Sequence, residues 1–213
     1  MKNGGIINIK KFYALMQLKD KCEYIIVIDD ESLFCRAVDL YKICNSFFER
    51  KILYGNTVEN ASWDFPHMVP NSCKKFFDEE IQKKLTSPLY LWFNQIPIYK
   101  CEHLKDFFKT TDMGHRIHWL AFTDFDYYVY MFYLIAQHGF DIKDIGITAC
   151  CAATEILSDF SCSINAPADT EFLYLATRYA KDNLNLKNVF ILCHRDREVA
   201  VQEKKNVFCK TSS

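Results

Sequence analysis

The sequence predicts a single Rossmann-like α/β domain over residues 1–213, with a mainly parallel sheet and helices on both faces of that sheet. Several segments have the composition of buried strands, because each is a short apolar run without polar alternation. Helical segments separate these runs, and strands that alternate with helices are typical of parallel sheets. A chain of 213 residues can bury the core of one domain. We expect the polar tail from about residue 200 onward to fray.

The expected elements follow one another along the chain. Strands are predicted at Glu23–Ile28, Lys51–Tyr54, Leu89–Phe93, Ile117–Phe122 and Val189–Cys193, with a weaker strand at Asp144–Thr148. Helices are predicted at Ser32–Arg50, Ser72–Leu85, Cys101–Lys109, Asp126–His138 and Asp169–Asp182. Gly139 follows the most apolar of these helices and favours its end there. The stretch Asn56–Pro70 is expected to be an irregular loop.

Composition and charge limit the classes of function. Hydrophobic residues make up 50% of the chain and charged residues 25%, which indicates a globular protein. The formal net charge is −1, so the chain as a whole gives no strong signal for nucleic-acid binding. We find neither a run of about 18 apolar residues that would predict a transmembrane helix nor the apolar region of a signal peptide. We therefore expect a cytoplasmic protein, with peripheral association at the inner membrane left open.

The ten cysteines do not follow a metal-binding or disulfide pattern. No Cys-x-x-Cys pair occurs, and Cys150 and Cys151 are adjacent, which suits neither a zinc site nor an ordinary disulfide. Because most cysteines lie in apolar segments, we expect reduced, buried thiols that behave as small hydrophobic side chains.

Polar side chains follow three of the predicted strands. Asp29 and Asp30 end the first strand, and Asn56 and Asn94 each follow a later one. In open α/β sheets ligands bind outside the carboxyl ends of the strands, where amides and carboxylates can contact a base or a ribose. The sequence therefore predicts these four residues as substrate-binding residues. The alternative interpretation is local, with Asp30 as a helix cap and the asparagines as turn residues.

The segment Thr123-Asp124-Phe125-Asp126 is the strongest candidate for a catalytic site, because it places two carboxylates between a predicted strand and an apolar helix. Such a pair can hold Mg²⁺ or Mn²⁺, which would neutralise a diphosphate leaving group. Tyr127 or Tyr128 could stabilise the departing phosphate by hydrogen bonding. We therefore predict Asp124, Asp126, Tyr127 and Tyr128 as catalytic residues, with Asp124 and Asp126 as the metal ligands. The same carboxylates could instead cap the helix, whose dipole favours negative charge there.

Three features follow one another along the chain. The segments IIVIDD, ILYGN and LWFNQ end in polar residues, an apolar helix followed by HGFDIKDIGIT fills residues Tyr128 to Thr148, and an Asp-initiated helix and a final strand follow between Ala168 and Leu192. This order resembles the small bacterial sialyltransferases and the related motility-accessory proteins. The resemblance implies a Rossmann-like nucleotide-sugar domain, a nucleotide-sugar donor and a glycan acceptor.

The chain departs from that family at three places. The family's Gly-Asn-Gly-Pro-Ser turn corresponds here to Asn3-Gly4-Gly5, its Thr-Ser-Gly is replaced by Asp126-Tyr127-Tyr128, and its catalytic His is absent from SCSINAPAD. In the family the first of these turns holds the nucleotide, and the His is the catalytic base.

Three hypotheses about function follow. The first is a glycosyltransferase that uses a nucleotide-sugar donor in bacterial surface polysaccharide or lipooligosaccharide synthesis. The second is a metal-dependent nuclease of the PIN or NYN kind, with Asp29, Asp124, Asp126 and Asp196 around Mg²⁺ or Mn²⁺. The third is a non-catalytic, degenerate nucleotide-binding domain, which the departures from the family favour.

Overall fold

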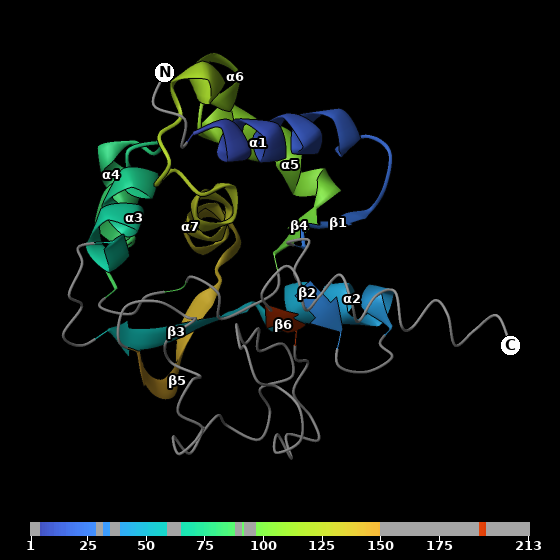
Figure 1. Ribbon diagram of the computed structural model, residues 1–213, viewed down its shortest axis with the longest axis vertical. Helices are drawn as coiled ribbons and strands as arrows, with labels where there is room; N and C mark the ends of the chain where they lie inside the picture. The colour runs from blue at the N-terminus through green and yellow to red at the C-terminus, as the bar shows by residue number, and fades with distance from the viewer. Residues whose placement is uncertain are drawn as a thin grey trace, which may run out of the picture.

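The computed structural model describes residues 5–28, 32–34, 39–58, 65–87, 91, 97–149 and 192–194. Within these ranges the protein is a mixed α/β structure, as predicted (Figure 1). Its helices are α1 (Ile6–Leu18), α2 (Leu40–Arg50), α3 (Phe65–Lys74), α4 (Glu79–Lys84), α5 (Cys101–Thr110), α6 (Met113–Arg116) and α7 (Asp126–His138). Its strands are β1 (Tyr24–Ile26), β2 (Ser32–Phe34), β3 (Ile52–Val58), β4 (Ile98–Lys100), β5 (Asp141–Ala149) and β6 (Leu192–His194).

The strands of the described ranges form pairs rather than one continuous sheet. β1 pairs with β4 and β2 with β6, both antiparallel, whereas β3 pairs with β5 in parallel. The parallel pair is the longest, and its register shifts between Gly55 and Thr57. The predicted parallel pairing is therefore present in one strand pair.

Helix α7 is the centre of the core. Every residue from Asp126 to Leu134 is buried, as expected of a helix that is apolar on nearly all sides. In Figure 1 it is seen end-on, with α3 and α4 on one side and α1, α5 and α6 above it. Gly139 adopts φ +67° and ends the helix, as predicted.

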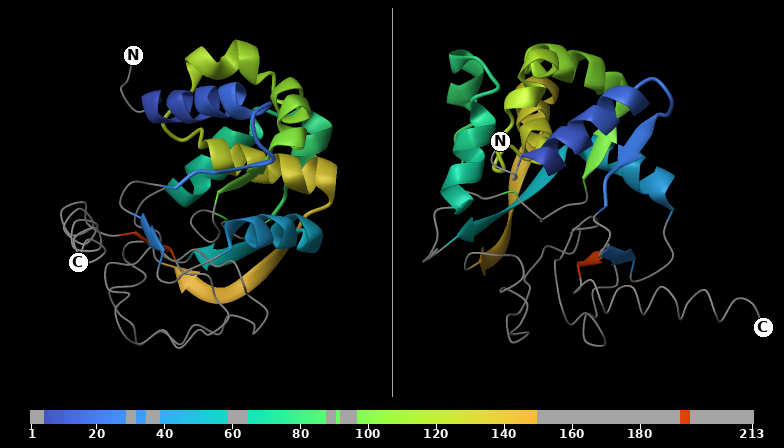
Figure 2. Two further views of the ribbon diagram at one scale, coloured as in Figure 1. Left: turned by 90° about the vertical axis from the view of Figure 1, so that its right-hand side faces the viewer. Right: turned by 45° about the horizontal axis from the view of Figure 1, so that its top comes forward.

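The chain reverses after α7 and enters β5. In the left view of Figure 2, α7 and β5 run in opposite directions, so the first turn of α7 and the carboxyl ends of β3 and β5 lie toward the same side of the molecule. This relation follows from the geometry of a helix that connects parallel strands. It brings the acidic segment before α7 to the side of the molecule where the parallel strands end.

The predictions of α5, α7 and the strands that became β1, β3 and β5 are confirmed. The predicted strand Ile117–Phe122 is wrong, because Ile117–Trp119 forms a 3₁₀ turn and a non-strand segment follows it. Ile117 and Leu120 are buried while Trp119 is 84% exposed. This three-residue spacing of buried side chains suits a 3₁₀ turn, whereas a strand would alternate.

Two predicted helices have the wrong limits: Ser32–Phe34 of the first forms strand β2, and aspartate caps set the starts of α2 and α4. Helix α2 begins after Asp39, whose side chain accepts a hydrogen bond from the Lys42 N–H at 3.0 Å. The predicted helix Ser72–Leu85 is divided into α3 and α4, because Asp78 caps α4 by accepting from the Ile81 N–H at 2.8 Å.

The predicted loop Asn56–Pro70 is wrong at both ends. Strand β3 continues to Val58, and α3 begins at Phe65 and includes Pro70. The predicted strand Leu89–Phe93 lies outside the described residues except for Leu91, and the predicted helix Asp169–Asp182 lies wholly outside them. None of the helices in the described ranges has the length and apolarity needed to cross a bilayer.

Candidate functional site

The acidic segment predicted to be catalytic forms a turn that leads into α7. Asp124 is 0% exposed and Asp126 is 2% exposed. The two carboxylates bond to different partners: Asp124 to residues of the α3 region, and Asp126 to Tyr99 of β4. Buried carboxylates require such partners, because an uncompensated charge in the interior is costly.

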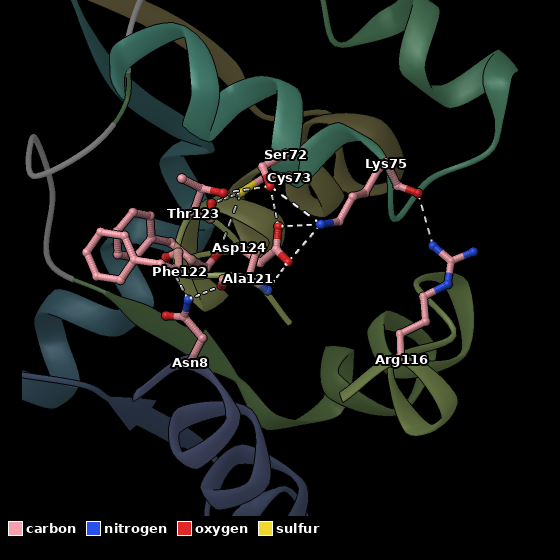
Figure 3. A network of polar contacts seen from close by, with 10 residues as sticks. Asn8, Ser72, Cys73, Lys75, Arg116, Ala121, Phe122, Thr123 and Asp124 are labelled. Atoms are coloured by element: carbon pink, nitrogen blue, oxygen red, sulfur yellow. Dashed lines mark hydrogen bonds and ion pairs between the residues drawn. The ribbon is translucent and has the colours of Figure 1, made fainter. Parts of the chain in front are cut away.

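Asp124 lies in a polar cluster that we call the Asp124 network, formed by Ser72, Lys75, Ala121, Thr123 and Asp124 (Figure 3). The Lys75 ammonium lies 2.7 and 2.8 Å from the two carboxylate oxygens. The Ser72 hydroxyl and the Ala121 N–H both donate to the carboxylate, the latter at 2.7 Å. Lys75 is 48% exposed, so the network reaches solvent at its ammonium group.

Three further side chains hold the turn around this network. Asn8 of α1 donates to the carbonyl oxygens of Ala121 and Phe122 at 3.0 and 2.9 Å. Arg116 donates to the Lys75 carbonyl oxygen at 3.0 Å, and the Cys73 thiol donates to that of Thr123 at 3.5 Å (Figure 3). The turn is therefore fixed directly from α1 and α3, while Arg116 of α6 holds the end of the α3 region that carries Lys75.

The arrangement limits what Ser72 can do chemically. Its hydroxyl donates to Asp124, which could act as a base, and it accepts from the Thr123 hydroxyl at 2.9 Å and from Lys75 at 3.5 Å. An oxygen whose lone pairs accept two hydrogen bonds is a weak nucleophile. The network thus has the residue types of a catalytic cluster but the hydrogen-bonding pattern of a structural one.

Asp126 occupies the first turn of α7, where the helix dipole favours a carboxylate. It accepts a hydrogen bond from the Tyr99 hydroxyl. Burial raises the pKa of the Asp126 carboxyl, while the charge of Lys11, the Tyr99 hydroxyl and the nearby backbone N–H groups act against that rise. The alternative interpretation of this residue, a stabilising charge at a helix start, fits these contacts.

The two predicted catalytic tyrosines point into the core. Tyr127 is 9% exposed and Tyr128 is 2% exposed, and burial raises the pKa of both phenols. The Tyr128 hydroxyl accepts from the Leu91 N–H at 3.3 Å. Neither hydroxyl is presented to solvent, so contact with a phosphate would require a local opening of the structure.

The predicted substrate-binding residues are only partly covered by the structure. Asn56 lies in β3, where the register with β5 shifts, near the carboxyl end of the parallel pair. Asp29, Asp30 and Asn94 lie outside the described residues. Of the four predicted substrate-binding residues, Asn56 alone therefore lies within the described residues.

A second group of titratable side chains lies between α5 and α7. The rings of His103 and His138 stack at 3.8 Å, and the Tyr133 hydroxyl lies 3.0 Å from His138 Nε2 and 2.9 Å from the Asp106 carboxylate. Burial, followed by the positive charge of a protonated His138, lowers the pKa of His103 to about 4. Burial also lowers the pKa of His138. Both imidazoles are thus neutral at pH 7.

Acid is expected to destabilise the protein through His103. The unfolded chain binds a proton at His103 near pH 6.5, whereas the folded chain binds it only near pH 4, so stability is lost as pH falls between these values. From pH 7 to pH 5 the expected loss is about 2 kcal/mol, at 1.36 kcal/mol per pKa unit. The prediction is checked by urea unfolding of the wild type and of His103→Phe, which keeps a stacked ring without its charge. The difference between the two proteins measures the contribution of His103 to the free energy of unfolding.

The comparison of the two proteins isolates His103 from the other groups around it. Glu102 opposes the pKa shift, while Lys100 and Lys51 reinforce it, and all three are unchanged in the variant. Equal losses of stability for wild type and variant between pH 7 and pH 5 would contradict the assignment.

In the described part of the chain no group of three or more His, Cys, Asp or Glu side chains is arranged to hold a metal ion. The carboxylates predicted as ligands are bonded to Lys75 and Tyr99 instead.

Comparisons with known proteins do not assign a function to this site. No family model, no curated protein and no solved structure matches the chain.

Proposed function

We propose that this chain is a single Rossmann-like domain that acts as a glycosyltransferase, taking a nucleotide-sugar donor for bacterial surface polysaccharide or lipooligosaccharide synthesis. The supporting observation is the parallel pair β3–β5, whose carboxyl ends lie toward the same side as the first turn of α7 (Figure 2). Nucleotides bind outside the carboxyl ends of parallel strands. The start of a helix at that edge also directs the positive end of its dipole toward a bound phosphate.

In this proposal the strand edge binds the nucleoside and the α7 segment acts on the sugar diphosphate. Asn56 contacts the base or the ribose. Asp124 and Asp126 are already hydrogen-bonded, so their proposed part is to hold the turn before α7 in the shape that meets the donor. These residues fit a magnesium site poorly, because an ion at Asp124 would have to displace Lys75 from 2.7 Å.

The third hypothesis, a non-catalytic nucleotide-binding domain, is favoured by one specific observation. Both carboxylates and both tyrosines of the predicted catalytic set are buried, whereas groups that act on a substrate must reach it. The two candidates share nucleotide binding and differ only in turnover, so one experiment separates them.

Nucleotide binding is expected to raise the melting temperature. The full chain is heated with the CMP, UDP, GDP and dTDP nucleotides and their sugars, each with and without Mg²⁺ or Mn²⁺. A ligand at 100 times its Kd adds about 2.7 kcal/mol, which for a domain of this size is a shift of roughly 5–11 °C. Asn56→Ala should reduce the shift, while Asn71→Ala, an exposed position on α3, should leave it unchanged.

Each outcome decides between the candidates. A shift with one nucleotide sugar, together with release of its nucleotide, supports the transferase and gives the donor class. A shift without turnover supports the non-catalytic domain. A response to the metal ions alone would favour the nuclease, and no response from a folded protein would contradict nucleotide binding altogether.

A further inference from the structure

Two thiols from distant parts of the sequence meet beside the β1–β4 pair. The sulfur atoms of Cys22 and Cys101 lie 3.6 Å apart, although 79 residues separate them along the chain. Cys22 precedes β1 and is exposed, whereas Cys101 is the first residue of α5 and is 4% exposed. One thiol is therefore accessible from solvent and the other lies directly behind it.

The backbone around the two cysteines holds them together. Tyr24 pairs with Lys100 in the antiparallel ladder, and the Cys101 N–H donates to the Glu23 carbonyl oxygen at 2.9 Å. A disulfide requires a sulfur separation of about 2.05 Å, so the sulfurs must approach by about 1.5 Å. Cys22 lies outside the core, where its side chain can turn, so rotation about its Cα–Cβ bond can supply this movement.

We propose that Cys22 and Cys101 form a thiol–disulfide exchange site that reduces a small disulfide, such as oxidised glutathione, and closes a Cys22–Cys101 disulfide. In the first step the Cys22 thiolate, having lost its proton to solvent, attacks one sulfur of the small disulfide. The old sulfur–sulfur bond breaks, a mixed disulfide forms on Cys22, and one thiolate leaves. In the second step the Cys101 sulfur attacks the Cys22 sulfur, and the second small thiol leaves with the proton of Cys101.

Exposure and burial assign the two roles. Cys22 meets the incoming disulfide because it is the exposed partner. Burial, followed by the hydrogen bond with Cys22, raises the pKa of Cys101 to about 12. The exposed Cys22 is therefore the attacking thiol, and the buried Cys101 behind it is the resolving cysteine.

A charged hollow adjoins the exposed thiol. It has a volume of about 420 Å³ and includes both cysteines and charged side chains of either sign: Lys19, Asp20, Glu23, Lys100, Glu102 and Lys105. Oxidised glutathione carries both carboxylates and ammonium groups, so its charges can be met by this lining. The size and the mixed charge of the hollow favour a small zwitterionic disulfide over an apolar one.

The closed disulfide would join the turn after α1 to the start of α5. A cross-link over so long a loop stabilises the fold mainly by restricting the unfolded chain. We expect the oxidised protein to melt roughly 5–15 °C above the reduced one. Cys22→Ser should abolish the difference, and Cys44→Ala, at a cysteine that is 1% exposed in α2, should retain it.

The bond itself is identified by peptide mapping. The folded full chain is equilibrated in buffers of defined glutathione ratio, its remaining thiols are alkylated, and the protein is digested with trypsin and Asp-N. The expected product links CEYIIVI, which contains Cys22 but not Cys35, to CEHLK, which contains Cys101. In Cys101→Ser the expected product is Cys22 joined to glutathione.

Other products would overturn the proposal. Wild-type Cys22 that stops at the glutathione adduct would show that Cys101 does not resolve it. Cys22 linked to a different cysteine, or unmodified in excess oxidised glutathione while circular dichroism shows a folded chain, would show that the two thiols do not form an exchange site.

Discussion

Replacing Asp124 with alanine is expected to lower the free energy of unfolding by about 2–4 kcal/mol, because hydrogen-bond donors left without an acceptor inside the structure cost about 1–3 kcal/mol each. The substitution leaves the Lys75 ammonium, the Ser72 hydroxyl and the Ala121 N–H without their shared acceptor. It also releases the turn that leads into α7. Urea denaturation followed by circular dichroism measures the loss.

Two companion variants make the result specific. Asp124→Asn keeps the shape and some of the hydrogen bonds, so its loss should be smaller. Glu80→Ala, at an exposed position in α4, should stay within about 0.5 kcal/mol of the wild type. If Asp124→Ala instead costs under 1 kcal/mol and abolishes donor turnover, Asp124 is a catalytic residue rather than a structural one.

Replacing Gly5 with alanine is expected to cost about 3 kcal/mol. A Cβ atom at Gly5 would lie 2.0 Å from the Leu120 carbonyl oxygen and 3.0 Å from the Leu120 carbonyl carbon. These are backbone atoms, so relief requires a shift of the chain before α1 or of the segment after the 3₁₀ turn. Overpacking of this kind typically costs 1–3 kcal/mol and sometimes more. Thermal and urea unfolding of the purified variant measure the effect.

Gly114→Ala is the matched control. An added Cβ at Gly114 meets nothing within 4 Å, and the residue lies in α6, where alanine is favoured over glycine by up to about 1 kcal/mol. The two changes are chemically identical and should have opposite signs. A Gly5→Ala protein as stable as Gly114→Ala would show that Gly5 does not lie against the Leu120 carbonyl group as described.

Local patterns predicted the parts of the fold that depend on local physics. Helix α7 and its end at Gly139 were predicted with the correct bounds. The sequence shows both an apolar run, which indicates a helix buried on all sides, and a glycine, which can adopt the left-handed conformation that ends a helix. Ile117–Phe122 failed because a short apolar run has no length or period that separates a strand from a 3₁₀ turn. Helix α1 was missed, although Asn8, Phe12 and Leu15 form its buried face at helical spacing.

The candidate site depended on contacts that the sequence cannot show. Two carboxylates before a helix were visible, but their partners lie far along the chain: Lys75 for Asp124, and Tyr99 for Asp126. The one local signal was the spacing of Ser72 and Lys75: Ser72 lies in the last turn of α3, and Lys75 directly follows its last residue, so both lie on one side of that helix end. The thiol pair of Cys22 and Cys101 had no such signal, because only the pairing of β1 with β4 brings it together.

The burial of α7 has a consequence for how the domain opens. Amide hydrogens exchange with solvent only when the structure around them opens, and the free energy of that opening differs between elements. The first nine residues of α7 are buried, so their amides should exchange only when the whole domain unfolds. Helix α4 has no buried residue and should exchange through local opening. Deuterium uptake should therefore proceed from the outer helices toward a central helix that opens last.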